Sequence, residues 1–441
     1  MRWMICWQVL VALHSLPPTN GQTPSPTLCN DDACRCDSFT RVICKCSQSS
    51  VEVTLRPNGA FRVPSMATAI TIDGCAKVQF LPETVGNLTQ LRTVQLKNID
   101  YIVISERGLA WSPFSRHSDM EPGIRITIEN STVDEISSHA IQGRVNDIII
   151  SDSRINNLRP FAFSSLTGLK NVELNNNEFK NIDIQTFKKF SVSNFVVRGG
   201  KIDTMPSRFL SDVEITNLFR LDSVNINYLS SLTFLVSSPK RILVENNLIG
   251  TLEGDGFHVI STGPITFRNN SISNLRKGAL LGFTVDAEVL STMGKQELLI
   301  DNNTITNLSP ASLIYNMSSL TLRIDGMNLN TTCSCEIADE WREIYEHGAI
   351  INCWYDLEGH FISIPTYVTI RCGSFKNNYW IFIVIAVVVV VLIVAIVLYF
   401  ALRHENEKKK KLQIVLPDGK TYRETEFHIV VERAELLTTE L

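Results

Sequence analysis

The chain has 441 residues, of which 44% are hydrophobic, and its 41 Lys and Arg nearly balance its 45 Asp and Glu, giving a formal net charge of −4. Such a chain lacks the broad basic surface by which proteins bind nucleic acid. Its one basic run, Lys408 to Lys411, directly follows an apolar segment. The composition therefore argues against a nucleic-acid partner. Length alone suggests two or three compact domains, unless a repeat array absorbs most of the chain.

The amino terminus has the layout of a secretory signal peptide. A positive charge precedes the apolar run 3–16, and two prolines then lead into small and polar residues up to Gly21. A buried amino-terminal helix is the alternative, but the prolines and the polar stretch argue against it. We expect residues 1–21 to be removed together with Cys6, leaving a chain exported to a compartment that permits disulfides.

Ten cysteines remain after this removal, and they form two clusters at the two ends of the central region. An even number in an exported chain indicates disulfides, whereas zinc binding by cysteine favours a reducing compartment. The first cluster is Cys29, Cys34, Cys36, Cys44, Cys46 and Cys75, and the second is Cys333, Cys335, Cys353 and Cys372.

Between the clusters, residues 70–329 repeat one spacing. An apolar residue is followed by key positions two, five, seven and ten residues later, as in Ile148, Ile150, Ser153, Ile155 and Leu158. The period is close to 23 residues, with two insertions of about ten residues. A fixed period of this length predicts a solenoid, because each unit has a short strand and a return segment, and neither buries its apolar side alone.

The position five residues after each start is Asn in four units. A buried amide there can bond the backbone of neighbouring turns, which we expect of Asn177, Asn247, Asn270 and Asn303. The rule is broken at Ser131, Ser153, Gly200 and Val224.

The unit resembles the leucine-rich repeat of extracellular proteins. Apolar residues 15 positions after the starts match its outer apolar position, namely Ile141, Phe163, Phe187, Leu210, Phe257, Leu280 and Leu313. The resemblance implies an α/β solenoid of horseshoe form, mostly β and irregular, with a parallel sheet on its concave side. Because Ile, Val and Phe often replace Leu, a parallel β-helix of similar period stays open.

The two cysteine clusters resemble the caps that cover the ends of such arrays, which implies an amino-terminal cap at 22–69, an array at 70–329 and a carboxyl-terminal cap at 330–373. The second cap contains a helix with Ile337, Trp341, Ile344 and Tyr345 on one face. The resemblance implies the pairs Cys29–Cys36, Cys34–Cys44, Cys333–Cys353 and Cys335–Cys372, and it leaves Cys46 and Cys75, which depart from the pattern, to bond each other.

Glycosylation acceptors of the form Asn-x-Ser/Thr fit an exported chain. Asn130, Asn269 and Asn302 stand directly beside the plus-five position, where a sugar is expected to be obstructed, so the other four are favoured. The seven acceptors are Asn87, Asn130, Asn269, Asn302, Asn307, Asn316 and Asn330.

Residues three positions after each start should face outward on the sheet, and they are polar and of mixed sign. They form either a solvated sheet face or a partner-binding surface, for which our candidates are Arg198, Asp222, Glu245, Arg268 and Asp301.

The insertions, around Gly108–Gly123 and Thr284–Lys295, extend loops from the solenoid. Trp111, with Pro113 and Phe114, gives the first loop either exposed contact residues or a local core.

A second apolar segment, residues 379–402, follows a short linker at 374–378. Its 24 uncharged residues can span the roughly 30 Å core of a bilayer. The basic run beyond it predicts a cytoplasmic carboxyl terminus and a single-pass type I protein of the plasma membrane.

Two short motifs stand in the expected cytoplasmic tail, residues 403–441. Glu432, Leu436 and Leu437 look like an acidic dileucine signal read by endocytic adaptors. Thr439 and Leu441 look like a ligand of PDZ-domain scaffolds, since a terminal carboxylate and Leu can add a strand to a sheet edge.

Enzyme motifs are absent from the sequence: it has no P-loop, no His-Glu-x-x-His and no Gly-x-Ser-x-Gly. We expect a non-enzymatic protein that uses no metal or cofactor. The resemblance to leucine-rich repeat receptors and adhesion proteins implies cell-surface recognition of an extracellular protein ligand or of a receptor on another cell. The alternative is a structural or accessory membrane protein that organises extracellular matrix or another membrane complex.

Overall fold

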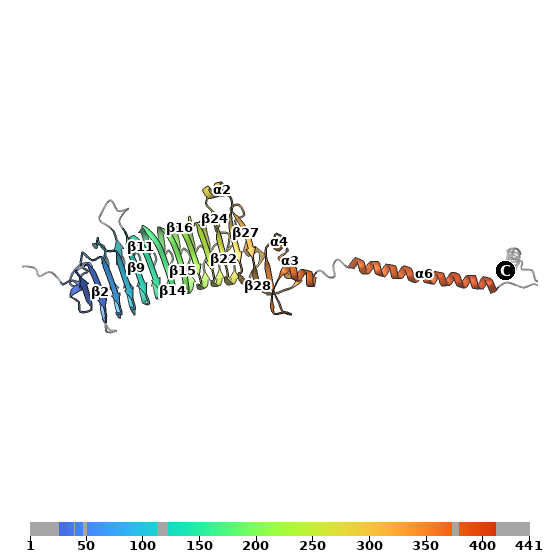
Figure 1. Ribbon diagram of the computed structural model, residues 1–441, viewed down its shortest axis with the longest axis horizontal. Coiled ribbons are helices and arrows are strands. Elements are labelled where there is room, and N and C mark those ends of the chain that lie inside the picture. Colours follow the sequence, from blue (N-terminus) through green and yellow to red (C-terminus); the bar gives the residue numbers. More distant parts are fainter. Residues whose placement is uncertain (1–25, 39, 47–50, 113–121, 373–378, 412–441) are drawn as a thin grey trace, which may run out of the picture. The chain divides into compact units, whose positions relative to one another are not determined.

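The computed structural model describes residues 26–38, 40–46, 51–112, 122–372 and 379–411. The chain divides into two compact units after Tyr367. The first contains the strands, and the second contains the long helix α6 (Figure 1). The expected signal peptide, the linker, Pro113, Phe114 and the tail motifs lie outside the described residues.

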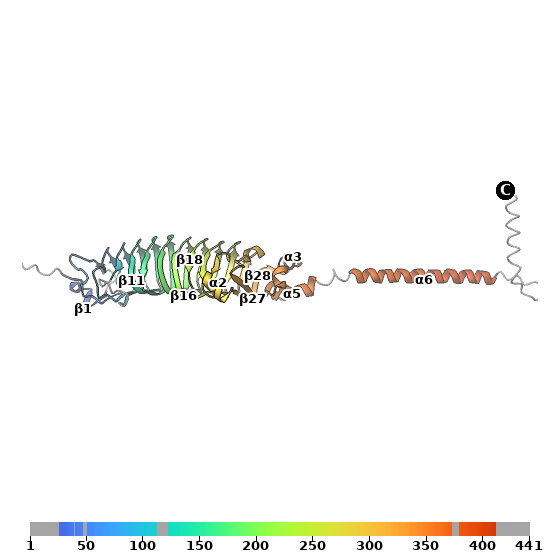
Figure 2. The same cartoon turned by 90° about the horizontal axis from the view of Figure 1, so that it is seen from above.

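The first unit is a solenoid of about 13 turns, mostly strand. Strands of successive turns lie side by side and pair in parallel (Figures 1 and 2). They form three ladders, here named A, B and C, on three sides of the coil. Ladder A contains β2 (Arg41–Lys45), β4 (Ala69–Asp73), β6 (Thr93–Lys97), β9 (Ile124–Glu129), β19 (Arg241–Glu245), β22 (Ile265–Arg268), β25 (Gln296–Asp301) and β27 (Leu320–Asp325).

Ladders B and C complete each turn. Ladder B contains β3 (Glu52–Leu55), β5 (Lys77–Phe80), β7 (Tyr101–Ile104), β10 (Thr132–Ile136), β12 (Arg154–Leu158), β17 (Asn225–Leu229), β20 (Leu248–Leu252), β23 (Ser271–Leu275), β26 (Thr304–Asn307) and β28 (Met327–Thr332). Ladder C contains β8 (Leu109–Trp111), β13 (Phe163–Thr167), β18 (Phe234–Ser237), β21 (Phe257–Ser261) and β24 (Phe283–Val285). Four long strands bend around corners and join the ladders: β11 (Ile141–Ser151), β14 (Leu169–Ile182), β15 (Phe187–Met205) and β16 (Leu210–Asp222).

The expected solenoid with a parallel sheet is confirmed. The return segments, which the sequence left unassigned, also form parallel strands, so parallel sheet is not limited to one side. The coil therefore has the three-sided arrangement of a parallel β-helix, the form that the repeat period left open. The second insertion forms the short helix α2 (Ala287–Met293), which is capped by the Asp286 side chain, and the 3-10 turn η3 (Pro310–Leu313) lies between β26 and β27.

The parallel ladders extend beyond the predicted array at both ends. At the amino end, β2 pairs in parallel with β4, and the antiparallel strand β1 (Cys34–Asp37) and the turn η1 (Leu28–Asn30) complete the cap. At the other end, β29 (Ile351–Tyr355) continues ladder B and pairs with the antiparallel strand β30 (His360–Ser363). The predicted cap segments therefore contribute strands of their own to the coil.

The carboxyl-terminal helix is divided at Trp341. The segment α3 (Cys335–Glu340) ends before this residue and α4 (Arg342–Glu346) begins after it. Trp341 is buried, while Ile337, Ile344 and Tyr345 are half-buried, so the predicted apolar face does pack inward. The helix α5 (Ile364–Tyr367) follows β30.

The core is a set of stacked columns running along the coil. Alternation in each ladder A strand directs residues such as Ile148 and Ile150 inward. The predicted outer apolar positions are also buried, and in ladder C they stack: the ring centroids of Phe163 and Phe187 lie 4.4 Å apart, and those of Phe234 and Phe257 lie 4.9 Å apart. Each turn thus covers the apolar side of the next.

The corner between ladders A and B has one recurring backbone conformation. The residue four positions after each start has a positive φ, which Gly and Asn adopt at little cost. This residue is Gly74, Asn98, Asn130, Asp152, Asn176, Gly199, Ser223, Asn246, Asn269, Asn302 or Gly326, and we name this row the A–B corner.

The second unit contains the π-helical turn η4 (Val368–Cys372) and the 33-residue helix α6 (Tyr379–Lys411). Within α6, Trp380–Asn406 is long and apolar enough to cross a membrane, and an 18-residue stretch of it has a mean hydropathy of 3.9. It is the one such helix in the described part of the chain. The helix begins where the sequence placed the membrane span and continues past its predicted end at residue 402.

Candidate partner-binding face

The outward side of ladder A brings the predicted binding residues together. They occupy matching positions on five neighbouring strands, so that each lies beside the next. The pairs in register are Arg198 with Asp222, Asp222 with Glu245, Glu245 with Arg268, and Arg268 with Asp301.

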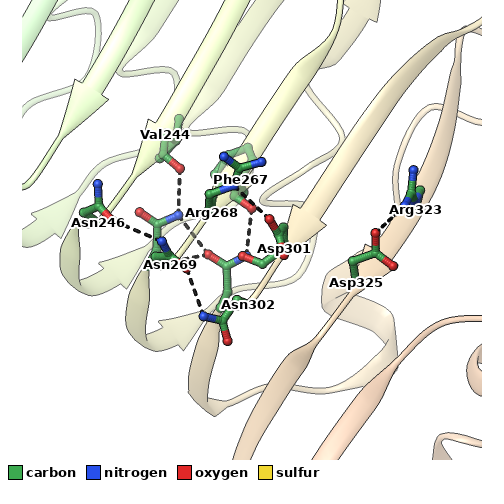
Figure 3. Close-up of polar contacts among 11 residues, drawn as sticks. Val244, Asn246, Phe267, Arg268, Asn269, Asp301, Asn302, Arg323 and Asp325 are labelled. Atoms are coloured by element: carbon green, nitrogen blue, oxygen red, sulfur yellow. Dashed lines mark hydrogen bonds and ion pairs between the residues drawn. The ribbon is translucent and has the colours of Figure 1, made fainter.

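These charges are paired with one another. The Arg268 Nε lies 2.8 Å from Asp301 Oδ2, and Arg323 makes a similar contact with Asp325 on the next strand (Figure 3). Arg220, two residues before Asp222, contacts Asp222 at 3.0 Å and Glu245 at 2.8 Å. The face is therefore electrically balanced along its length.

Asp222 is held in a fixed position and is only 7% exposed. Burial raises the pKa of Asp222, but hydrogen bonds from Asn246 and Ser223 and the charges of Arg220 and Arg198 outweigh burial and lower this pKa below its ordinary value. Partner binding by Asp222 stays a prediction, but its side chain is nearly buried and its charge is used within the sheet.

A column in which half-buried apolar residues alternate with polar ones lies beside the charged column, and sequence reasoning missed it. It is formed by residues one position after the repeat starts, where Ile149, Val196, Leu243 and Leu299 alternate along ladder A with polar or charged residues. The signal was present in the sequence, since this position also faces outward by strand alternation.

Trp111 is a correction to the sequence analysis. It was proposed as an exposed contact residue, but it is 1% exposed and belongs to ladder C. Its Nε1 donates to the Leu88 carbonyl at 2.7 Å, and the Arg92 guanidinium lies 5.8 Å from its ring centre. The alternative of a local core is confirmed for this residue.

Buried asparagines support the A–B corner from inside, as the sequence predicted. Asn270 accepts a bond from the Asn247 backbone N–H at 3.0 Å and donates to the Val244 carbonyl at 2.8 Å. Asn303 repeats this one turn later, accepting from the Asn270 N–H at 2.9 Å and donating to the Phe267 carbonyl at 2.9 Å. These amides replace the ladder bonds that the turning backbone cannot make.

The glycosylation acceptors lie outside the strands of ladder A. Asn130, Asn269 and Asn302 stand on the A–B corner, where their side chains are exposed, so burial does not obstruct them. Of the favoured four, Asn87, Asn307 and Asn330 are exposed and Asn316 is half-exposed.

Disulfides lie at both ends of the solenoid. The structure joins Cys29 to Cys36, Cys34 to Cys44, Cys46 to Cys75 and Cys333 to Cys353, which are four of the five pairs expected. Cys335 and Cys372 are each disulfide-bonded as well.

No group of three or more His, Cys, Asp or Glu side chains in the described ranges has an arrangement that could hold a metal ion. No protein-family model matches the chain, and no curated protein matches it at a significant level.

Proposed function

We propose that this chain is a non-enzymatic cell-surface recognition or adhesion protein, akin to leucine-rich repeat receptors, that binds a partner protein through ladder A. The observation that carries the proposal is the pairing of two columns on one extended face. One column contains paired, balanced charges, and in the other half-buried apolar residues alternate with polar or charged ones.

Such a face suits a protein partner. Apolar side chains supply buried area on association, while charges held in fixed positions favour a partner with complementary charges. Extended solenoid surfaces commonly recognise proteins in this way. The strands of ladder A contain none of the seven glycosylation acceptors, which leaves this face open.

The helix α6 supports attachment to a membrane by a single span. We propose the plasma membrane, with the solenoid outside and the carboxyl terminus in the cytoplasm, because basic residues follow the apolar segment in the sequence. The tail motifs ending at Leu437 and Leu441 would then recruit an endocytic adaptor and a PDZ-domain scaffold.

The test uses the full chain displayed on cells. Surface cross-linking identifies the partner protein, and its affinity is then measured for a double variant, Arg268→Glu with Asp301→Arg, which reverses one exposed ion pair of ladder A. We expect binding to weaken by about ten-fold or more, equivalent to about 1.4 kcal/mol, because the reversed pair meets like charges on the partner.

The matched control is Arg154→Glu with Glu178→Arg, since this pair has a similar separation and exposure but lies on ladder B. Equal weakening by both double variants, or no weakening by the first, would contradict the proposed face. Clustering of cells that display the full chain would distinguish adhesion from an accessory role in another membrane complex.

A further inference from the structure

Two glycosylation acceptors occupy equivalent positions on adjacent turns. Asn269 follows β22 and Asn302 follows β25, and both have the positive φ of the A–B corner. The backbone N–H of Asn269 donates to Asp301, the residue directly before Asn302. Their separation of 33 positions corresponds to a complete turn with one insertion, so residues distant in sequence become neighbours in space.

Their side chains form a continuous row of amide hydrogen bonds (Figure 3). The Nδ2 of Asn302 donates to the Oδ1 of Asn269 at 2.9 Å, and the Nδ2 of Asn269 donates to the Oδ1 of Asn246 at 3.3 Å. An asparagine amide has two N–H groups, and the row uses one of them. Each acceptor can therefore bear a glycan while keeping its bond in the row.

Adjacent strands lie only about 4.8 Å apart, and the row directs both side chains the same way. Two glycans at this spacing would emerge side by side from neighbouring strands. A branched oligosaccharide, however, is wider than the distance between two adjacent strands. Two sugars at this spacing would compete for the same space on the A–B corner.

Asn130 provides an internal comparison on the same corner. Its Nδ2 donates to the Oδ1 of Asn98 at 2.7 Å, but neither Asn98 nor Asp152, its neighbours on the corner, is an acceptor. A polar hollow of about 440 Å³, open to solvent, lies beside Asn130 and is lined by Asp100, Asp152 and Arg154 among others. This hollow gives a glycan at Asn130 room beside the corner.

We propose that Asn269 and Asn302 are alternative glycosylation sites, so that each folded chain carries a glycan on one of the two, while Asn130 is modified independently. The inference rests on the extracellular location in the proposed function. The protein would then exist in two glycoforms, which differ in whether the sugar stands on Asn269 or on Asn302 at the corner beside the binding face.

The test measures site occupancy on full-length protein collected from the surface of expressing cells. Enzymatic glycan release in heavy-oxygen water converts each occupied Asn into a labelled Asp, which mass spectrometry quantifies. We expect the occupancies of Asn269 and Asn302 to add up to one glycan per chain. A sum clearly above one, or no glycan at either site, would overturn the inference.

Substitution of the third acceptor residue removes a site without touching the amide row. Ser271→Ala abolishes the acceptor at Asn269, and Thr304→Ala abolishes that at Asn302. Each variant should raise the occupancy of the remaining site by the share that the first one loses. Thr132→Ala, which removes the acceptor at Asn130, should leave both unchanged.

The outcome for the remaining acceptors separates this inference from the proposed function. If Asn130 and Asn87 bear glycans and both Asn269 and Asn302 are also filled, only the alternative use of Asn269 and Asn302 is overturned. Complete absence of glycans from all seven acceptors would contradict the extracellular location as well.

Discussion

At the residue scale, Trp111 contributes to stability through packing and one buried hydrogen bond. We expect Trp111→Ala to lower the free energy of unfolding by about 3–5 kcal/mol, because a large core side chain is lost. Trp111→Phe should cost about 1–3 kcal/mol, because the Leu88 carbonyl is left unpaired. Urea unfolding of the full chain in detergent checks both values. The exposed Ile184 provides a control, and an effect of Ile184→Ala equal to that of Trp111→Ala would contradict this account.

Asp222 gives the stability of the solenoid a pH dependence. Its pKa in the folded chain lies below the ordinary value, so its ionised form stabilises the fold above that ordinary value, and this contribution is lost as pH falls through the folded pKa. We expect Asp222→Asn to lower stability at pH 7 by about 1–3 kcal/mol, the range for hydrogen bonds to charged groups. Thermal unfolding between pH 7 and pH 3 should show the difference from wild type shrinking towards the acid end. A difference independent of pH would be inconsistent with a lowered pKa.

At the element scale, the corner depends on amides that connect one turn to the next. Asn270→Ala removes the partners of the Asn247 backbone N–H, of one N–H of the Asn247 side-chain amide and of the Val244 carbonyl. We expect a loss of at least about 3 kcal/mol, because each buried group left unpaired costs about 1 kcal/mol or more. The corresponding change at the exposed Asn227 should cost less than about 1 kcal/mol. Urea midpoints measure both, and hydrogen exchange should accelerate at the Asn247 amide in the first variant alone.

At the scale of the whole molecule, the amino-terminal end is stabilised by disulfides that close loops of different lengths. Cys46–Cys75 spans 29 residues, and Cys29–Cys36 spans seven. Because a longer closed loop restricts the unfolded chain more, we expect replacing Cys46 and Cys75 by Ser to cost roughly 3–4 kcal/mol and the shorter pair roughly 2–3 kcal/mol. Thermal unfolding of the two double variants gives the order. The reverse order would show that strain or local packing outweighs loop length.

The repeat spacing made most of the solenoid predictable, because every turn must bury the same positions against its neighbours. Ile148, Asn177 and Phe163 lie inside as expected, since alternation and period alone assign them an orientation. The strands of the return segments were harder to predict, because ladder C has few residues per turn and its alternation of buried and exposed residues is short. The pairing of β2 and β29 with the array was not predicted for a related reason, since their sequences lack the full repeat.

The candidate face was only partly predictable. Strand alternation gave the outward direction of Arg268 and Asp301, but not that the charges pair across strands or that Asp222 is nearly buried. Trp111 shows the same limit, since an aromatic residue beside an insertion has the same local sequence whether it points into solvent or into the core.

By itself, the sequence determined the period, the inward columns, the cysteine clusters at the two ends and the apolar segment of α6, because each follows from spacing or composition along the chain. Only the tertiary structure decided which distant residues are neighbours. The parallel register brings Arg198 beside Asp222 and Asn269 beside Asn302, and such contacts depend on how 23-residue and 33-residue turns stack rather than on any local pattern.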